Sequence, residues 1–456
     1  MTRSLRAAAA HLTDAAIAAV RPETLLPRRL AWQRGELLLD GRPFTVPVRP
    51  TGRIAVIGGG KAAAGMAAAL DAILHDGDVT GLVSVPEGCG RPVARIEIPE
   101  TRPPAANLPT AAVVAVTHEM RRLLATLGSE DLAVVIVTGG GSALLEEPAP
   151  GVDLADLIAV TRFLSAAGAD IRELNVVRQA VSLVKAGGLA RACTAGRLVA
   201  VVLSDVIGDP LDLIASGPCM PAGSAPDAAL AILRRHAALD AAPRVTRHLE
   251  EAAVTTTPQP ATGGEWTTPA GCRVSHVLVG SNATAVDAAS RAAHQLGYDV
   301  TIRHAGTATE TAEAVGRRLA TEAAGLVTAA RHDGRARAVI EGGEAVVTLP
   351  RDHGTGGRNQ QTVLAAVEAW QPTAGAWPAE LLIASVGTDG EDGPTAAAGG
   401  LVDRAVAEQL TASGIDLARA IDRCDAYPAL AAAGGLIVTG PTGTNVADVR
   451  IILARP

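Results

Sequence analysis

Residues 53–70 read RIAVIGGGKAAAGMAAAL, which is a β-branched run, a turn of three glycines and an Ala-rich segment. Residues 53–57 are typical of a buried strand, and the spacing of apolar residues over 62–70 predicts a helix. A short apolar run followed by a polar or Gly-rich turn recurs at residues 132–142 and 198–209. Buried strands that alternate with helices predict a parallel sheet covered by helices.

A stretch without apolar periodicity, residues 255–271, reads TTTPQPATGGEWTTPAG. Its content of Thr, Pro and Gly is typical of a linker or a long loop. Beyond it the pattern restarts, with candidate strands at residues 277–280, 299–302, 338–341, 381–386 and 435–439 and a candidate helix at 282–296. We therefore expect an α/β protein of two domains, each a mainly parallel sheet sandwiched by helices. The predicted parts are residues 1–250, a linker at 251–271, and residues 272–456.

The composition excludes several classes of protein. Hydrophobic residues make up 48% of the chain, aromatic residues only 2%, and the formal net charge is -7. No block of Lys and Arg is present, so nothing indicates binding to nucleic acid or to an acidic membrane surface. The five cysteines form no Cys-x-x-Cys pair, and the ten histidines show no zinc-site spacing. Isolated thiols of this kind are typical of a reducing compartment.

Residues 1–20 read MTRSLRAAAAHLTDAAIAAV and place apolar residues at helical spacing. They contain an acidic residue and no continuous apolar core, so an ordinary first helix is favoured over a cleaved transit segment. The apolar runs of the chain are too short for a membrane span. We expect a cytoplasmic protein that binds small molecules, neither nucleic acid nor membrane, and for which a homodimer would be unsurprising.

Two cations stand where sequences usually place an acidic residue. Lys61 follows three glycines at the start of the predicted helix 62–70, and Arg358 holds the same place before 362–370. A positive side chain at a helix N-terminus opposes the helix dipole by about 0.3–1 kcal/mol. A bound phosphate or carboxylate would reverse that sign, because dipole and side chain would both attract it. Close packing of glycines and solvated surface cations are the alternative readings, but we favour an anion that Lys61 and Arg358 approach from separate halves of the chain.

Acidic residues follow two of the predicted strands. Asp205 and Asp209 come after the strand 198–203, and Asp389 comes after 381–386. Phosphoryl transfer needs Mg²⁺, which binds one or two carboxylates beside the nucleotide phosphates. Asp205 is also placed to position or deprotonate a substrate hydroxyl. Turn chemistry favours Asp beside Gly, so a structural role for each is the alternative.

The better-known catalytic motifs do not match. Lys61 is followed by Ala62, so no Walker phosphate loop is present, and the protein-kinase signatures are absent. Gly58, Gly59 and Gly60 resemble a dinucleotide fingerprint, but no acidic residue for a ribose follows about twenty residues later. An NAD(P)H-dependent reductase is therefore the alternative enzyme. Ser142 does not lie in a nucleophile elbow, which argues against a serine hydrolase.

Longer segments carry a resemblance to one enzyme family. They are VIGGGKAAAGMA (56–67), VTGGGSALLEEP (137–148), ELNVVRQAVSLVKAGGLA (173–190), LSDVIGDPLDLIASGP (203–218), GGE (342–344), GTGGRNQQ (354–361), GTDGEDGPTAAAGG (387–400) and TGPTGTNVADV (439–449). In these segments the chain resembles the glycerate 2-kinase family, in which a glycerate-kinase domain precedes a MOFRL domain. The resemblance covers nearly the whole chain.

The resemblance implies an ATP- and Mg²⁺-dependent kinase that converts D-glycerate to 2-phosphoglycerate in a cleft between the domains. Lys61, Arg358 and Asp205 match catalytic positions. The positions implied for substrate are Ser142, Asn175, Arg178 and Lys185; those for nucleotide are Gly58, Gly59, Gly60, Gly139, Gly140, Gly141, Gly356, Gly357 and Asn359; those for metal are Asp209 and Asp389.

The chain departs from the family pattern at several positions. Arg102 stands where a Gly-His-Pro segment has His, Gln179 and Ala180 replace a Lys-His pair, and Gln361 replaces a Glu. We expect several of these positions to line the substrate side. A kinase for a related sugar acid, a hydroxypyruvate reductase and a non-catalytic metabolite-binding member remain the alternatives.

Overall fold

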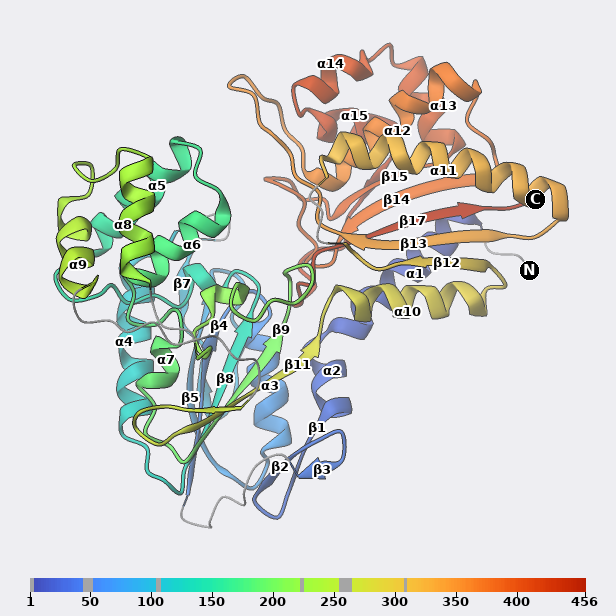
Figure 1. Ribbon diagram of the computed structural model, residues 1–456. Helices are drawn as coiled ribbons and strands as arrows, with labels where there is room; N and C mark the ends of the chain where they lie inside the picture. The colour runs from blue at the N-terminus through green and yellow to red at the C-terminus, as the bar shows by residue number, and fades with distance from the viewer. Residues whose placement is uncertain (1–3, 44–51, 104–107, 222–224, 254–264, 307–309) are drawn as a thin grey trace. The chain divides into compact units, whose positions relative to one another are not determined.

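The computed structural model describes residues 4–43, 52–103, 108–221, 225–253, 265–306 and 310–456. The chain forms two compact units. The first unit is Leu25–Val279, and the second unit combines Met1–Thr24 with Gly280–Pro456. Each contains a sheet and helices (Figure 1), which confirms the predicted α/β class.

The first unit is built on a sheet of eight strands with a parallel centre. Its central strands are β4 (Arg53–Gly59), β5 (Asp78–Pro86), β8 (Leu132–Thr138) and β9 (Arg197–Leu203). β4 pairs in parallel with β5 and β8, and β8 pairs in parallel with β9. Every residue of β8 and β9 is buried, as expected for a parallel sheet covered on both faces. The predicted strands 53–57, 132–138 and 198–203 are confirmed.

Shorter strands complete the sheets of the first unit. They are β6 (Ile96–Glu97), β7 (Glu100–Arg102), β10 (Trp266–Thr267) and β11 (Arg273–Gly280), with β1 (Leu30–Gln33), β2 (Glu36–Leu39) and β3 (Arg42–Pro43) in a separate small sheet. The strand order is β10-β11-β9-β8-β4-β5-β6, with β7 beside β5. The chain therefore leaves β4 toward β5 on one side and later returns to β8 on the other. This is a topological switch point, where open α/β sheets bind ligands beyond the carboxyl ends of their strands.

The helices of the first unit fall into two groups. α3 (Ala63–Ile73), α4 (Ala111–Ala125) and α7 (Gly188–Arg191) accompany the sheet, whereas α5 (Leu154–Ala166), α6 (Ile171–Ala180), α8 (Pro226–Arg235) and α9 (Pro243–Ala253) share their own apolar cluster (Figure 1). Short helical turns are η1 (Gly141–Ala143) and η2 (Ile214–Ser216), and α2 is Pro22–Arg29. α3 begins one residue after the predicted start at Ala62.

The second unit differs from the prediction of a mainly parallel sheet. Its order is β12-β13-β17-β14-β15-β16, with β12 (Asp299–Arg303), β13 (Arg337–Gly343), β14 (Leu381–Gly387), β15 (Gly399–Val402), β16 (Leu436–Ile437) and β17 (Asp448–Ala454). Among the described strands of this sheet, β12 and β13 pair in parallel, and the other four pairs are antiparallel. The last strand, β17, inserts between β13 and β14 in the opposite direction. A buried apolar run has the same pattern in either direction, so periodicity does not reveal this.

The register of β17 brings remote segments to one edge of the sheet. Asp448 is paired with Gly343 at the end of β13 and with Gly387 at the end of β14. The first residue of β17 therefore lies level with two strand ends that are far away in sequence. The turns that follow β13 and β14 meet at Asp448.

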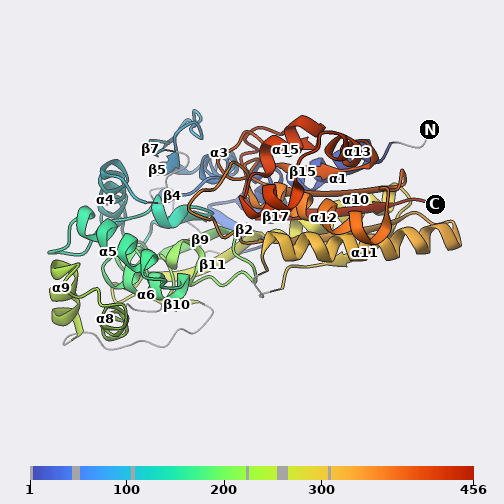
Figure 2. The same ribbon diagram turned by 90° about the horizontal axis from the view of Figure 1, so that it is seen from above.

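The helices of the second unit include one from the opposite end of the chain. They are α1 (Leu5–Val20), α10 (Asn282–Gln295), α11 (Ala312–Asp333), α12 (Arg358–Ala374), α13 (Arg404–Ala412), α14 (Leu417–Asp422) and α15 (Ala426–Ala433). α11 and α12 lie side by side (Figures 1 and 2). α1 packs on α10, β14 and β17, so the predicted first helix is confirmed but belongs to the second unit.

The predicted linker 251–271 is wrong at both ends. α9 continues to Ala253, and β10 and β11 form an antiparallel pair beside β9 in the sheet of the first unit. Residues 254–264 lie outside the described part. Cys272 and Val274 are buried in the apolar cluster of that sheet, and this burial holds the segment there. The unit boundary falls at residue 279 instead.

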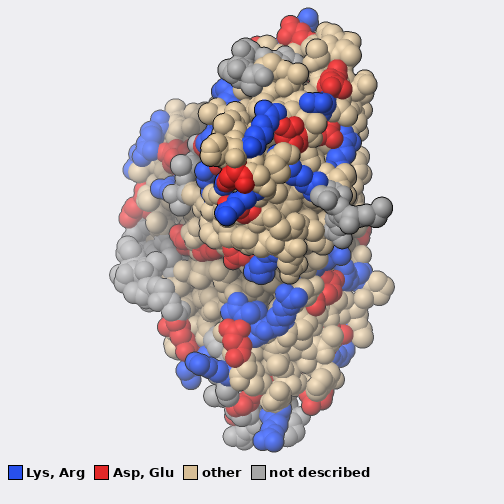
Figure 3. All heavy atoms as spheres, turned by 90° about the vertical axis from the view of Figure 1, so that its right-hand side faces the viewer, with Lys and Arg blue, Asp and Glu red and all other residues tan. Residues whose placement is uncertain are grey.

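The surface agrees with the sequence-based reading of charge. On the face shown in Figure 3, Lys and Arg side chains are interspersed with Asp and Glu. None of the helices in the described ranges is both long and apolar enough to cross a membrane. All five cysteines are free, and the buried thiols of Cys193 and Cys272 lie 3.7 Å apart.

Candidate active site

Lys61 lies where two loops of the first unit meet. It follows β4, and its backbone N–H donates to Gly139 O at 2.8 Å, in the loop after β8. The N-cap residue of α3, Ala62, supplies no side-chain hydrogen bond. The side chain of Lys61 is half-buried. A cation thus lies at the helix N-terminus and at the switch point of the sheet. An anion bound there would be attracted by both the helix dipole and the charge of Lys61.

The glycines before Lys61 have a packing role, and their contact with nucleotide stays a prediction. Gly58 and Gly59 are strand residues of β4, and a Cβ on Gly58 would lie 2.2 Å from Ile136 O. The Gly60 N–H donates to Ser84 O at 3.2 Å. Close approach of neighbouring strands therefore explains these glycines.

Residues 139–142, here called the glycine turn, follow β8 directly. Gly139 and Gly141 are buried, whereas Gly140 is exposed. A Cβ placed on Gly140 would lie 3.7 Å from Lys61 Cγ and 3.9 Å from Arg102 Nη2. Two cationic side chains thus lie beside the exposed residue of the glycine turn.

Three of the predicted substrate positions converge at the end of the glycine turn. The hydroxyls of Ser142 and Ser216 lie 3.0 Å apart, and Ser216 donates to Asn175 Oδ1 at 3.2 Å. Since the single proton of Ser216 is used on Asn175, Ser142 is the donor of the first bond. The Arg178 guanidinium donates to Ser142 O at 3.2 Å, and burial lowers the pKa of Arg178.

Ser216 is held in an uncommon backbone conformation. Ala215 has φ 50° and Ser216 has φ 62°, and Gly217 continues the left-handed run with φ 63°. Non-glycine residues adopt this region at a cost of about 1–3 kcal/mol each, and such strain persists where the surroundings fix it. The strained segment lies against the glycine turn: a Cβ on Gly141 would be 3.0 Å from that of Ala215.

Lys185 supports the glycine turn from inside the unit. Its ammonium donates to Ser142 O at 2.8 Å and Leu145 O at 3.2 Å and pairs with Glu146 at 3.2 Å. Both side chains of the pair are fully buried. Burial lowers the pKa of Lys185 to about 8 against the opposing effect of Glu146. The fully buried ammonium thus holds the backbone of Ser142, and a contact of Lys185 with substrate stays a prediction.

The roles predicted for the two acidic residues after β9, a catalytic one for Asp205 and metal binding for Asp209, stay predictions. Asp205 and Asp209 are half-buried, and the Ser204 hydroxyl donates to Val206 O at 3.1 Å within the turn. Asp209 has a φ of 53°, which marks a tight and strained turn at this strand end.

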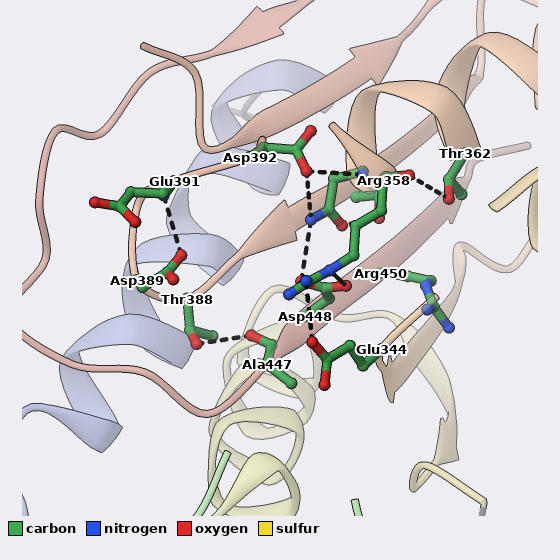
Figure 4. A network of polar contacts seen from close by, with 12 residues as sticks. Glu344, Arg358, Thr362, Thr388, Asp389, Glu391, Asp392, Ala447, Asp448 and Arg450 are labelled. Carbon is green, nitrogen blue, oxygen red and sulfur yellow. Dashed lines mark hydrogen bonds and ion pairs between the residues drawn. The ribbon is translucent and has the colours of Figure 1, made fainter. Parts of the chain in front are cut away.

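In the second unit, Arg358 is the centre of a polar network (Figure 4). It is the first residue of α12, which begins four residues before the predicted helix 362–370. Its guanidinium donates to both oxygens of Asp448, at 2.7 and 2.9 Å, and pairs with Glu344 at 3.0 Å. Burial alone would lower the pKa of Arg358, but the carboxylate of Asp448 outweighs it and raises the pKa. Arg358 is therefore a fixed cation whose orientation is set by β17.

The N-terminus of α12 already binds a carboxylate of the protein. Asp392 accepts from the backbone N–H of Asn359 at 3.0 Å and of Gln360 at 2.9 Å. The side chain of Asn359 is buried and bonded to Asp392, Asp448 and Ser385. The groups of Asn359 are therefore used internally, and its contact with nucleotide stays a prediction.

The two glycines before α12 also have packing roles. A Cβ on Gly357 would lie 2.3 Å from the Asp392 carboxyl carbon, and one on Gly356 would lie 3.2 Å from Ala426 N. The absence of side chains at Gly356 and Gly357 thus lets Asp392 and Ala426 approach, and the nucleotide contacts of these glycines stay predictions.

Asp392 predicts a specific pH dependence of stability. Burial and the charge of Asp448 raise the pKa of Asp392 from 3.8 to about 6. The hydrogen bonds that Asp392 accepts and the charge of Arg358 lower this pKa but do not outweigh the increase. Between pH 4 and pH 6 the native state binds this proton more tightly than the unfolded state. The contribution of Asp392 to the free energy of unfolding therefore falls as pH rises, by at most about 1.4 kcal/mol per pH unit. Urea unfolding between pH 4 and pH 6 should show that the free energy of unfolding of the wild type falls relative to that of Asp392→Asn. A difference between the two proteins that does not change with pH would contradict this prediction.

Asp389 lies in the turn after β14. Its carboxylate accepts from Glu391 N at 3.0 Å, and its backbone carbonyl accepts from Thr442 N at 3.2 Å. The described residues hold no cluster of three or more His, Cys, Asp or Glu side chains arranged for a metal ion. Mg²⁺ commonly takes only one or two carboxylates and completes its shell with water and phosphate. Asp209 and Asp389 thus stay predicted ligands.

Several departures from the family pattern prove to be internal. Gln361 is buried and donates to Glu313 at 2.9 Å and to Ile421 O at 2.7 Å. Ala180 is buried in the apolar cluster of α5, α6, α8 and α9. These two positions do not line a substrate side as expected, whereas Arg102 lies against the glycine turn.

Sequence reasoning missed four carboxylates. Asp448, Asp392 and Glu344 stand in segments that carry the family resemblance, but nothing local distinguished them from other turn acids. Glu146 could have been paired with Lys185 only by knowing that both are buried. A buried cation requires a carboxylate partner. A Lys within an apolar run is therefore the sequence signal that could have indicated a buried ion pair.

Comparisons with known proteins agree with this architecture. A model described as "Domain of unknown function (DUF4147)" matches residues 8–250, and one for the MOFRL family matches 337–448. A D-glycerate 2-kinase of Thermotoga maritima is 34% identical over 89% of this chain and 92% of its own length. A putative hydroxypyruvate reductase of Agrobacterium vitis is 35% identical over 99% and 94%, respectively.

A crystal structure of glycerate kinase from Thermotoga maritima matches with a TM-score of 0.80 and 32% identity, covering 99% of each chain. Sequence similarity over almost the whole length and the same fold lead to one assignment. The chain belongs to the family of the glycerate kinases, with a DUF4147 region followed by a MOFRL region.

Proposed function

We propose that the chain is an ATP-dependent kinase that phosphorylates D-glycerate to 2-phosphoglycerate. The observation that carries this proposal is the position of Lys61 beside the glycine turn, at the switch point of a parallel sheet. Relatives named D-glycerate 2-kinase and glycerate kinase support the reaction and its acceptor. Lys61 would neutralise charge on the transferred phosphoryl group.

The neighbours of Lys61 suit a hydroxy acid. Ser142 directs its proton to Ser216, so the lone pairs of its hydroxyl stay available as acceptors. An acceptor of this kind suits the hydroxyl of the substrate rather than its carboxylate. Lys185 and Arg178 hold the backbone of Ser142 in place.

In the second unit, Arg358 is proposed as a further cation that binds negative charge of a substrate or a nucleotide. Asp448 fixes its guanidinium by two hydrogen bonds, so little reorganisation is needed when charge develops on the phosphoryl group. Asp209 and Asp389 are the residues proposed to hold Mg²⁺, and Asp205 to position the acceptor hydroxyl. Bound there, Mg²⁺ would supply positive charge that neutralises the nucleotide phosphates.

The test is a pair of assays on the purified protein. With ATP, Mg²⁺ and D-glycerate it should release ADP, and ³¹P NMR should identify 2-phosphoglycerate. With NADH and hydroxypyruvate it should show no loss of absorbance. The reverse pattern would establish a reductase, as the name of the Agrobacterium vitis relative suggests. A panel of hydroxy acids in the ADP assay would reveal a different sugar acid as substrate.

A further inference from the structure

Arg102 is a buried cation at the candidate site. It ends β7, which pairs in parallel with β5, so it leaves the sheet at the edge where ligands bind. Only 2% of its surface is exposed. Its backbone is fixed by Glu87, whose N–H donates to Arg102 O at 2.9 Å. The preceding Thr101 is anchored by a 2.7 Å hydroxyl contact with Ser84.

The guanidinium of Arg102 shares its surroundings with Lys61. A single point, the Cβ position of Gly140, lies 3.9 Å from Arg102 Nη2 and 3.7 Å from Lys61 Cγ. Among the residues that the structure describes, no other heavy atom outside the adjoining chain lies within 4 Å of that point. Both side chains therefore border one exposed backbone position, where an anion would meet the guanidinium of Arg102 and the side chain of Lys61 together.

We propose that Arg102 binds an oxyanion of the substrates at the glycine turn, together with Lys61, and thereby helps to set substrate specificity. A guanidinium presents a planar fork of donors that matches a carboxylate or a phosphate bidentately. This inference rests on the proposed function, because the oxyanion is the glycerate carboxylate or a nucleotide phosphate. Of Arg102, Ala180 and Gln361, which all depart from the family pattern, only Arg102 lies at the turn.

The test compares Arg102→Gln, Arg102→Lys and Arg102→His in the full chain. Arg102→Gln should raise the KM for D-glycerate or for ATP about 10–100-fold, as loss of a charge-assisted bidentate contact implies. The KM that rises identifies which anion is bound. Arg102→Lys should recover most of the loss, because it restores the charge.

Arg102→His adds a second measurement, the pH dependence of KM, which would not change if Arg102 had only a structural role. Its KM should rise with pH as the imidazole loses its proton near pH 6.5, whereas wild-type KM should change little there. Titration of inorganic phosphate and of D-glycerate by calorimetry gives affinities without turnover. Weakened binding of either anion to Arg102→Gln would support the inference even if no kinase activity were found. Unchanged KM and unchanged anion affinity in both Arg102→Gln and Arg102→His would overturn it.

Discussion

Replacing Lys61 with alanine lowers kcat by about 10²–10³-fold, as loss of one electrostatic donor in an active site commonly does. The half-buried side chain lies at the N-terminus of α3 beside the glycine turn and contributes no large apolar surface. The thermal unfolding temperature should therefore stay within a few degrees of wild type. Steady-state kinetics of ADP release, with unfolding monitored in parallel, is the measurement.

A matched control is available in the same unit. Arg122 lies on α4, and 66% of its side chain is exposed. Its pair with Glu119 one turn away is of the exposed kind, which contributes about 0–1 kcal/mol. Arg122→Ala should keep both kcat and stability. Near-normal turnover of Lys61→Ala would show that the transferred phosphate does not lie at the glycine turn.

Replacing Lys185 with methionine should destabilise the first unit by about 3–5 kcal/mol, because removal of one partner leaves a buried charge uncompensated. Glu146 would keep one hydrogen bond, which the Ser182 hydroxyl donates to its other oxygen at 2.5 Å. Ser142 O would lose the ammonium donor, so activity should fall as well. Urea denaturation of the variant and the wild type gives the difference.

A second substitution separates charge from volume. Lys185→Met with Glu146→Gln removes both charges and keeps similar volume, so it should recover much of the lost stability. The Ser182 hydroxyl can still hydrogen-bond to a glutamine. If the single and double variants unfold at the same urea concentration, the buried pair is not what the glycine turn depends on.

Individual elements show where sequence reasoning succeeded. The strands β4, β8 and β9 were predicted within two residues, because β-branched runs bounded by glycine are typical of buried strands. Lys61 and Arg358 were located at the starts of α3 and α12 by the same local pattern. The N-terminus of α12, however, is capped by Asp392, which accepts from the N–H of Asn359, thirty-three residues away. No local signal joins the two segments.

The glycines illustrate the same limit. Gly58 and Gly357 were predicted to approach a phosphate, whereas they approach Ile136 and Asp392. The sequence reveals that something comes close to the backbone there, but a strand, a loop and a ligand all require the absence of a side chain. Only coordinates distinguish them.

By itself the sequence determined the local elements, the α/β class and the positions of the two helix-terminal cations, because these follow from periodicity and turn chemistry within a few residues. The tertiary structure decided the partners: α1 packs against the second sheet, β17 inserts between β13 and β14, and Asp448 thereby holds Arg358. Hydrophobic burial is non-directional, so an apolar face specifies that it will be covered and leaves the covering element to packing across the whole chain.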